Sequence, residues 1–383
     1  MNSHLRYRKL GVVWASLAAM CMVSPLAAET VLHNFARPQG SGPYAGVIRD
    51  SAGNLYGTTS RGGSAGRGVV YKLDASGHET VLHSFAGGAD GTQPAAGVIR
   101  DSAGNLYGTT PKGGSADRGV VYRVDASGHE TVLYNFTGGA DGGNPIAGVI
   151  RDSAGNLYGT TFYGGSAGRG VVYKVDASGH ETVLYTFTGG ADGSVPYGGV
   201  IRDSAGNLYG TTYEGGNACG SAGCGVVYKV DATGHETVLY TFTGGADGMF
   251  PQVGVIRDSA GNLYGTTTLG GSANGGVVYK VDATGHETVL YTFTGGAGGD
   301  TPTAGVIRDS AGNLYGTTFD GGLGAGVVYK VDATGHETVL YSFIGGTDGS
   351  KPWAGVIRNS AGKLYGTTTG GGRNGLGVVF RIP

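Results

Sequence analysis

The residues that could do chemistry in this chain are those that differ between near-identical repeats. The segment GNLYGTT begins at Gly53, and six similar segments follow it at nearly regular intervals. Between these segments, two short stretches of each repeat vary, and they hold large aromatic and charged side chains. The variable residues predicted to bind a ligand are Tyr44, Arg61, Lys112, Phe162, Tyr163, Tyr197, Tyr213, Glu214, Phe250, Phe319, Asp320 and Trp353. Aromatic side chains on a rigid rim suit stacking on sugars, peptides or planar ligands.

Two alternatives to ligand binding apply to the same positions. Paired carboxylates about 5–9 Å apart can cleave a polysaccharide, so Glu214 and Asp320 could serve a lyase or a glycoside hydrolase. These two residues are two repeats apart, which predicts a wider spacing unless the loops fold inward. Relaxed drift at exposed loop positions is the second alternative, but drift favours small polar residues over aromatics. The sequence predicts no metal site and no cofactor.

The elements that position these residues are four short runs in each repeat of about 51 residues. In the third repeat they are residues 147–152 (run a, AGVIRD), 157–161 (run b, LYGTT), 170–176 (run c, GVVYKVD) and 181–187 (run d, ETVLYTF). The runs are rich in β-branched and aromatic residues and are separated by Asp/Gly turns, so they predict four antiparallel strands and essentially no helix. Gly57, in the middle of run b, is expected to allow close approach of the next repeat.

The pattern of run c indicates how the sheets are arranged. Its apolar residues are consecutive, so both faces of each sheet must be covered, as in radially packed blades. The repeats begin with a lone d run, residues 30–35, and end with a seventh c run, residues 377–382. A linear solenoid does not require the array to begin with the last run of a repeat and to end one run short. In a ring, residues 30–35 can supply the missing strand of the last sheet. We therefore predict an all-β, seven-bladed β-propeller over residues 29–383, with the b–c and d–a loops on one face.

The repeat resembles the GloVer-type tandem repeat, known from exported bacterial proteins. The matching segments are P-x-A-G-V-I-R-D, D-S-A-G-N-L-Y-G-T-T, the following G-G, and G-V-V-Y-K-V-D, and they cover almost all of residues 29–383. The resemblance implies a propeller-like fold and provides no catalytic residues. The D-x-x-G-N-L-Y segment is also similar to that of NHL-type propellers, though less specifically.

Charge and the N-terminus indicate the compartment. The formal net charge is -2, and charged residues make up only 14%, which excludes a basic nucleic-acid platform. Three basic residues precede an apolar core at 10–23, and small residues follow, so residues 1–28 are predicted to be a cleaved signal peptide. The mature chain is expected to be secreted or periplasmic, monomeric and without a membrane span.

Repeated charged residues and the cysteines are expected to be structural. Arg49 and its six equivalents end run a, and each precedes Asp or, once, Asn359, so Arg–Asp pairing is favoured over an anion site. Cys219 and Cys224 lack the further ligands of a zinc site, which favours a local disulfide in an oxidising compartment.

These observations predict an exported, non-enzymatic binding or scaffold protein. Its ligand, a glycan or a peptide, is expected on the face formed by the b–c and d–a loops. A polysaccharide-active enzyme and a structural component of the extracellular matrix are the alternatives.

Overall fold

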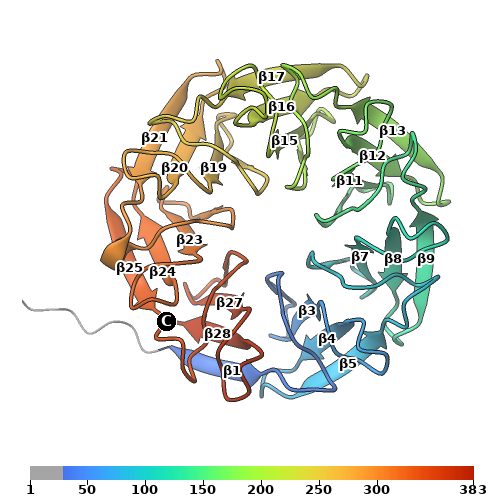
Figure 1. Ribbon diagram of the computed structural model, residues 1–383. Coiled ribbons are helices and arrows are strands. Elements are labelled where there is room, and N and C mark those ends of the chain that lie inside the picture. The colour runs from blue at the N-terminus through green and yellow to red at the C-terminus, as the bar shows by residue number, and fades with distance from the viewer. Residues whose placement is uncertain (1–28) are drawn as a thin grey trace, which may run out of the picture.

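The computed structural model describes residues 29–383 as a ring of seven four-stranded antiparallel sheets around a central axis (Figure 1). The predicted β-propeller is thus confirmed. A single 3-10 turn, η1 (Gly296–Gly298), is the only helical element among these residues. The predicted signal peptide, residues 1–28, lies outside the described residues.

Each blade contains strands a to d from the centre outward. The strands of blades one to four are β2 (Ile48–Arg49), β3 (Leu55–Thr59), β4 (Val69–Leu73), β5 (Glu79–Ser84), β6 (Ile99–Arg100), β7 (Leu106–Thr110), β8 (Val120–Val124), β9 (Glu130–Asn135), β10 (Ile150–Arg151), β11 (Leu157–Thr161), β12 (Val171–Val175), β13 (Glu181–Thr186), β14 (Ile201–Arg202), β15 (Leu208–Thr212), β16 (Val226–Val230) and β17 (Glu236–Thr241). The strands of blades five to seven are β18 (Ile256–Arg257), β19 (Leu263–Thr267), β20 (Val277–Val281), β21 (Glu287–Thr292), β22 (Ile307–Arg308), β23 (Leu314–Thr318), β24 (Val327–Val331), β25 (Glu337–Ser342), β26 (Ile357–Arg358), β27 (Leu364–Thr368), β28 (Val378–Ile382) and β1 (Thr30–Asn34).

The two ends of the repeat array close the ring within one sheet. The order of blade seven is β1-β28-β27-β26, so the N-terminal strand is its outermost strand (Figure 1). The antiparallel register pairs Thr30 with Arg381 and Asn34 with Val378. Phe35, just after β1, is fully buried and meets the ring of Tyr71 in blade one edge-on, with centroids 5.3 Å apart. The closure predicted from the offset of the repeats is confirmed.

The glycine in each b strand has a different role from the one predicted. Gly57 pairs with Tyr71 of the neighbouring strand in its own blade. A Cβ on Gly57 would lie 2.5 Å from the Tyr71 hydroxyl oxygen, so the missing side chain makes room for that ring. The expectation that Gly57 admits the next blade was wrong, because the space is filled from within the blade.

Hydrogen bonds from threonine join each blade to the next around the whole ring. The hydroxyl of the fourth b-strand residue, at most 1% exposed, donates to a carbonyl of the following blade at 2.8–3.0 Å. The seven bonds run from Thr58 to Ala96, Thr109 to Ala147, Thr160 to Gly198, Thr211 to Val253, Thr266 to Ala304, Thr317 to Ala354 and Thr367 to Ala45. Loss of one donor would leave a buried carbonyl unsatisfied, at a cost of about 1–3 kcal/mol. These bonds therefore fix the position of the segment that leads into each a strand.

Partly buried carboxyl groups lie at the outer side of the blade interfaces. Glu181, which begins β13, is near Asp141 of the preceding blade, and Asp141 accepts a hydrogen bond from the Tyr134 hydroxyl at 3.0 Å. Oε1 of Glu181 is buried without a hydrogen-bond partner among the described residues. Burial raises the pKa of Glu181 to about 7, and the negative charge of Asp141 adds to the effect. Five further glutamates have a pKa raised to about 7 by burial: Glu29, Glu130, Glu236, Glu287 and Glu337.

These glutamates predict that the fold is more stable in mild acid. Their folded-state pKa lies above the ordinary value of 4.5, so their contribution is complete below about pH 4.5 and is lost as pH rises through about 7. The melting temperature should therefore fall between pH 5 and pH 8. Glu181→Gln should be more stable than the parent at pH 8 and equal to it at pH 5, as measured by thermal unfolding.

The matched control for that experiment is Glu79→Gln. Glu79 occupies the same position in blade one, but it contacts Nε2 of His33 at 3.1 Å. Its replacement removes the carboxylate from this contact and should bring no gain at pH 8. Equal stabilisation by both variants would contradict the explanation that burial without a partner, together with the charge of Asp141, destabilises ionised Glu181.

Closure of the ring gives a second prediction. A chain that begins after Phe35 would leave blade seven with three strands and a free edge. It should lose at least about 3 kcal/mol, the ordinary cost of removing one buried phenylalanine, and it should self-associate through the exposed edge. Chemical denaturation and size-exclusion chromatography test this against a chain that begins at residue 29. Equal stability and a monomeric state would show that β1 is dispensable.

Candidate functional site

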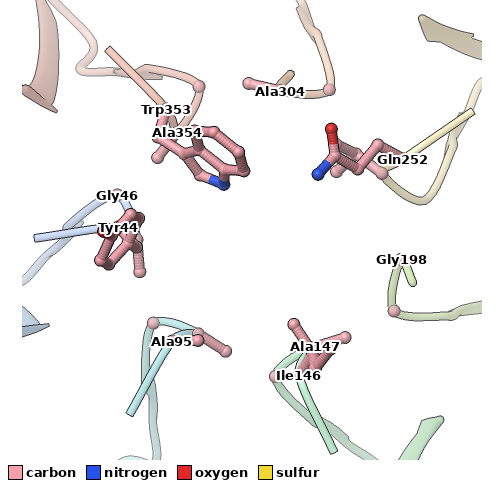
Figure 2. A pocket seen from close by; sticks show the side chains of 18 of the residues that line it. Tyr44, Gly46, Ala95, Ile146, Ala147, Gly198, Gln252, Ala304, Trp353 and Ala354 are labelled. Carbon is pink, nitrogen blue, oxygen red and sulfur yellow. The ribbon is translucent and has the colours of Figure 1, made fainter. Parts of the chain in front are cut away.

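The seven blades surround one central pocket with a volume of about 560 Å³. One variable residue from each repeat lines it, always the residue that follows the proline of the d–a loop (Figure 2). These seven residues are Tyr44, Ala95, Ile146, Tyr197, Gln252, Thr303 and Trp353. The next two residues of each loop, mostly Ala and Gly, complete the wall. Of the twelve predicted ligand residues, only Tyr44, Tyr197 and Trp353 line the pocket. Ile146, Gln252 and Thr303 were missed, although their position after the proline marks them.

Two loops of each blade pair with each other on the pocket face. One residue of the d–a loop forms an antiparallel bridge with one residue of the b–c loop in all seven blades, as Ser41 does with Arg61. The predicted common face of these loops is therefore confirmed. The bridges also place Arg61, Lys112, Tyr163, Glu214 and Asp320 in a second layer of chain, which does not line the pocket.

The residue before each proline turns the chain toward the pocket. It has a φ of 56° to 64° in all seven loops, and in six of them it is not glycine. Val195 is one of these, and a β-branched residue is rarely found in this conformation. Two hydrogen bonds hold it, because its N–H donates to the carbonyl of Arg169 and its carbonyl accepts from the N–H of Tyr213, both at 2.9 Å. Strain of this kind persists only where the surroundings fix the backbone, so the pocket wall is rigid.

Trp353 is held between two other aromatic rings. The Tyr44 ring lies 5.9 Å away and the Phe319 ring 5.3 Å away, measured between centroids, and both are nearly perpendicular to the indole. Trp353 of blade seven thus contacts Tyr44 of blade one across the closure of the ring. Lys351 Nζ lies 4.3 Å above the Phe319 ring and also contacts a carboxylate oxygen of Asp320.

A second aromatic group lies across blades three to five. The ring of Tyr197 at the pocket wall meets Phe162 at 5.5 Å and Tyr213 at 6.1 Å. Tyr213 in turn stacks on Phe250 at 4.9 Å. Phe162 and Tyr213 therefore support the Tyr197 ring directly, and Phe250 supports Tyr213. None of these three residues lines the pocket.

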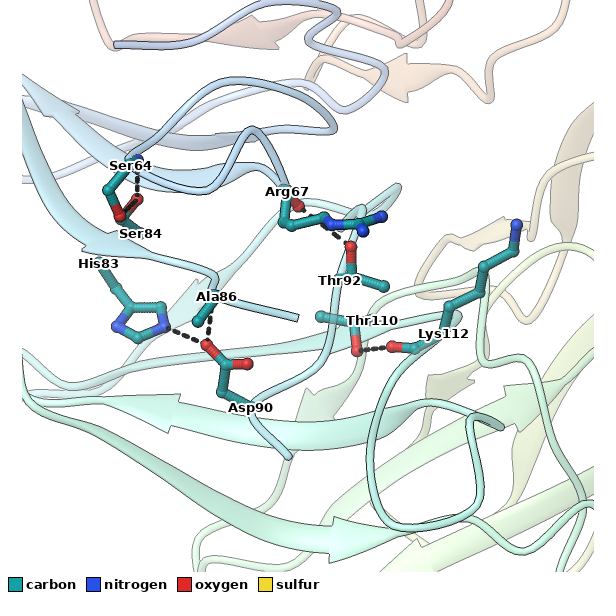
Figure 3. A network of polar contacts seen from close by, with 9 residues as sticks. All are labelled: Ser64, Arg67, His83, Ser84, Ala86, Asp90, Thr92, Thr110 and Lys112. Atoms are coloured by element: carbon teal, nitrogen blue, oxygen red, sulfur yellow. Dashed lines mark hydrogen bonds and ion pairs between the residues drawn. The ribbon is translucent and has the colours of Figure 1, made fainter. Parts of the chain in front are cut away.

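The charged residues predicted on this face do not line the pocket. Lys112 is exposed, and its backbone carbonyl accepts a hydrogen bond from the Thr110 hydroxyl at 2.8 Å (Figure 3). Arg61 is likewise exposed, and Asp320 is paired with Lys351. No charged side chain lines the central pocket. Within residues 29–383 no group of three or more His, Cys, Asp or Glu side chains is arranged to hold a metal ion.

Two serines, Ser64 and Ser166, lie in a local pattern that could suggest a hydrolase. Gly62–Gly66 and Gly164–Gly168 both read G-x-S-x-G, which in hydrolases places a nucleophile on a strand-to-helix turn. Here each segment joins two strands, and the Ser64 hydroxyl lies 3.2 Å from that of Ser84 (Figure 3). The required strand-to-helix context is therefore missing at both serines.

The arginines on the opposite face stack on tyrosines instead of pairing with aspartates. Each guanidinium lies over the tyrosine ring of the preceding blade at 5.3–5.8 Å, as Arg100 lies over Tyr56. The Tyr56 hydroxyl donates to Asp50 at 3.1 Å. Partial burial alone would raise the pKa of Asp50, but hydrogen bonds from Asn54 and Tyr56 and the charge of Arg100 lower it. The expected direct Arg–Asp pairs are wrong, because the tyrosine lies between the two charges.

Three comparisons place the chain among known proteins. The profile of the Gloeobacter/Verrucomicrobia repeat matches residues 21–222, 101–322 and 217–383. No curated protein matches the chain. Among solved structures, a candidate 6-phosphogluconolactonase from Bacteroides uniformis is 16% identical with a TM-score of 0.52, covering 82% of this chain and 88% of that one.

Two further solved structures are similar at the level of the fold. The WD40 β-propeller domain of Doa1 is 11% identical with a TM-score of 0.50, covering 92% of this chain and 97% of that one. The extracellular domain of a candidate one-component system from B. thetaiotaomicron is 10% identical with a TM-score of 0.51, covering 92% of this chain and 39% of that one. At these identities the likeness shows the propeller fold alone.

A disulfide joins Cys219 and Cys224 in the b–c loop of blade four, with Cα atoms 5.6 Å apart. The predicted pairing is thus present. Cys219 has a φ of 61°, and both sulfur atoms lie against Gly244 of the following d–a loop. The bond therefore holds the inserted residues of this loop against the pocket face.

The disulfide predicts protected thiols and a modest gain in stability. A thiol reagent applied to the mature protein in denaturant without reductant should label neither cysteine. Denaturant is required because Cys224 is fully buried in the folded chain. The double variant Cys219→Ser, Cys224→Ser should lose about 2 kcal/mol in chemical denaturation, the chain-entropy value for so short a loop. Labelling of both cysteines before reduction would disprove the bond, and a reduced sample provides the positive control.

Proposed function

The chain belongs to the Gloeobacter/Verrucomicrobia repeat family, and on that premise we propose that it is an exported, non-enzymatic binding protein. Its ligand, a glycan or a peptide, occupies the central pocket. One observation supports this above all others: the single variable residue after each of seven prolines reaches the same pocket. A framework repeated nearly unchanged thus presents seven independently variable side chains to one space. Rigid concave sites with aromatic walls are typical of ligand binding.

The compartment in this proposal follows from three observations. The Cys219–Cys224 disulfide suits an oxidising environment. Residues 1–28 have the composition of a signal peptide. In residues 29–383 there is no helix with the length and apolar character needed to cross a membrane. We therefore place the mature protein in the periplasm or outside the cell, and we further propose that it is a monomer that does not bind nucleic acid.

The geometry favours binding over polysaccharide cleavage. The two carboxylates that an enzyme would use, Glu214 and Asp320, are absent from the pocket wall. Asp320 contacts Lys351, which neutralises it, and Glu214 belongs to a backbone bridge with Ser194. Glycoside hydrolysis ordinarily uses two carboxyl groups that flank the scissile bond, and the wall of this pocket supplies none.

The proposal predicts that binding depends on the aromatic side of the pocket. The double variant Trp353→Ala, Tyr44→Ala should keep the fold, because neither side chain belongs to the repeated framework. It should cost about 1–2 kcal/mol or more in binding free energy for a ligand found by screening. Trp353 is the only tryptophan in residues 29–383, so its fluorescence reports occupancy directly.

Two controls belong to this measurement. Ser127→Ala, in a turn on the opposite face, should leave affinity unchanged. Tyr163→Ala removes an aromatic side chain of the pocket face that is 52% exposed and does not line the pocket. This variant should also leave affinity unchanged. If the double variant binds as tightly as the parent, the variable residues reflect drift and a structural role in the extracellular matrix becomes the better explanation.

A further inference from the structure

The central pocket offers no partner for a charge. Its wall consists of Ala, Gly, Val, Ile, Thr, Gln, Trp and Tyr side chains. The nearby Lys351 and Asp320 contact each other, so neither is free to pair with a ligand. Transfer of an ionised group from water into such a site without a partner is strongly unfavourable. The ligand that fits this wall is uncharged.

One side of the pocket presents an indole held in a fixed orientation. Trp353 and Tyr44 lie next to each other at this side, and Gln252 faces them across the space with its amide directed inward (Figure 2). Phe319 supports the indole from behind. Tyr44 is 37% exposed, and Trp353 is half-buried, so both rings remain accessible. A fixed aromatic face of this kind stacks well on a saturated ring that presents its C–H bonds on one face.

The remaining polar groups of the wall are neutral and come from separate blades. The hydroxyls of Tyr44 and Tyr197 make no hydrogen bond within residues 29–383. The Gln252 amide makes one weak contact, through its oxygen with the Thr268 hydroxyl at 3.4 Å. The Thr303 hydroxyl donates to the Trp353 carbonyl at 3.1 Å and so presents only acceptor capacity. A ligand that satisfies these groups must carry several neutral hydrogen-bonding groups, such as hydroxyls, around its edge.

The backbone of the wall does not suit an extended peptide. Binding of an extended peptide by strand addition depends on backbone groups of the site that are free to pair with the backbone of the ligand. In this pocket the carbonyls of Ala45, Ala96 and Ala147 already accept threonine hydroxyls of the preceding blades. Side chains, not main chain, are therefore the recognition elements of this wall.

From these observations we infer that the central pocket binds a neutral carbohydrate, with one sugar ring stacked on Trp353 and its hydroxyls bonded to Gln252, Tyr44 and Tyr197. The inference rests on the proposed binding function and adds the chemical class of the ligand. A sugar ring combines an apolar face with a hydroxylated edge, which is the combination that this wall presents. Charged side chains, which an acidic polysaccharide would require, are absent from the wall.

The test is a titration of residues 29–383 with defined probes, followed by Trp353 fluorescence and calorimetry. The probes are neutral hexose oligosaccharides, uronic-acid and sulfated oligosaccharides of equal length, and a peptide library. Neutral oligosaccharides should bind, and the acidic ones should not. Trp353→Ala and Gln252→Leu should each raise the Kd about tenfold, an ordinary hot-spot loss. Gln252→Leu keeps the size of the side chain and removes only its amide, so a purely apolar ligand would not be weakened by it.

Tyr44→Phe and Tyr163→Phe form a matched pair. Each removes one phenolic hydroxyl, but only Tyr44 lines the pocket. Tyr44→Phe should weaken the binding of neutral oligosaccharides, and Tyr163→Phe should not.

The outcomes separate the ligand class from the binding function. Trp353-dependent binding of acidic oligosaccharides or of peptides would overturn the neutral-carbohydrate class and leave the binding function intact. Binding of neutral oligosaccharides that Trp353→Ala does not weaken would overturn both, because the sugar would then lie outside the central pocket. The absence of binding to all three probe sets would also overturn both.

Discussion

The interaction on which this structure most depends is the hydrogen bond from a buried threonine of one blade to a backbone carbonyl of the next. Seven such bonds, from Thr58 around to Thr367, form a closed circuit in which the last joins blade seven to blade one. Each accepting carbonyl lies in the d–a loop, between the d strand of one blade and the a strand of the next. This loop has no strand partner at that point, and the threonine of the earlier blade supplies the donor, as Thr58 does for Ala96. A closed circuit has no terminal blade, and the N-terminal strand β1 completes the seventh sheet at the same closure.

The same bonds determine what kind of site the ring can form. The accepting residue directly follows the one that lines the pocket, as Ala45 follows Tyr44. The proline and the left-handed residue before it fix the same segment from the other side. Backbone direction is therefore set by the framework, and the side chain after each proline is the wall position that differs most between blades. Such a site loses little conformational entropy on binding, which favours rigid recognition.

At a few positions one repeat has a different residue from the others, and each such change affects the contacts of a single blade interface. Gly298 stands where most repeats have Asp, next to Tyr291, and Asn359 replaces the Asp that accepts the tyrosine hydroxyl elsewhere. Phe380 takes the position of the buried tyrosine and still meets Phe343 edge-on at 5.1 Å. The ring accommodates these changes because each alters one interface and leaves the threonine bonds unchanged.

The sequence by itself determined the number of blades, the four strands of each, the closure by residues 30–35, the common face of the variable loops and the cysteine pairing. These features follow from turn residues, strand periodicity and repeat phase, all of which are local in the chain. Only the tertiary structure decided that the d–a residues line the pocket while the b–c residues, among them Glu214 and Lys112, form a layer behind them. It also decided that Arg100 stacks on Tyr56 and that Gly57 makes room for Tyr71. Such contacts depend on the direction of side chains and on neighbouring strands or blades, and spacing along the sequence specifies neither.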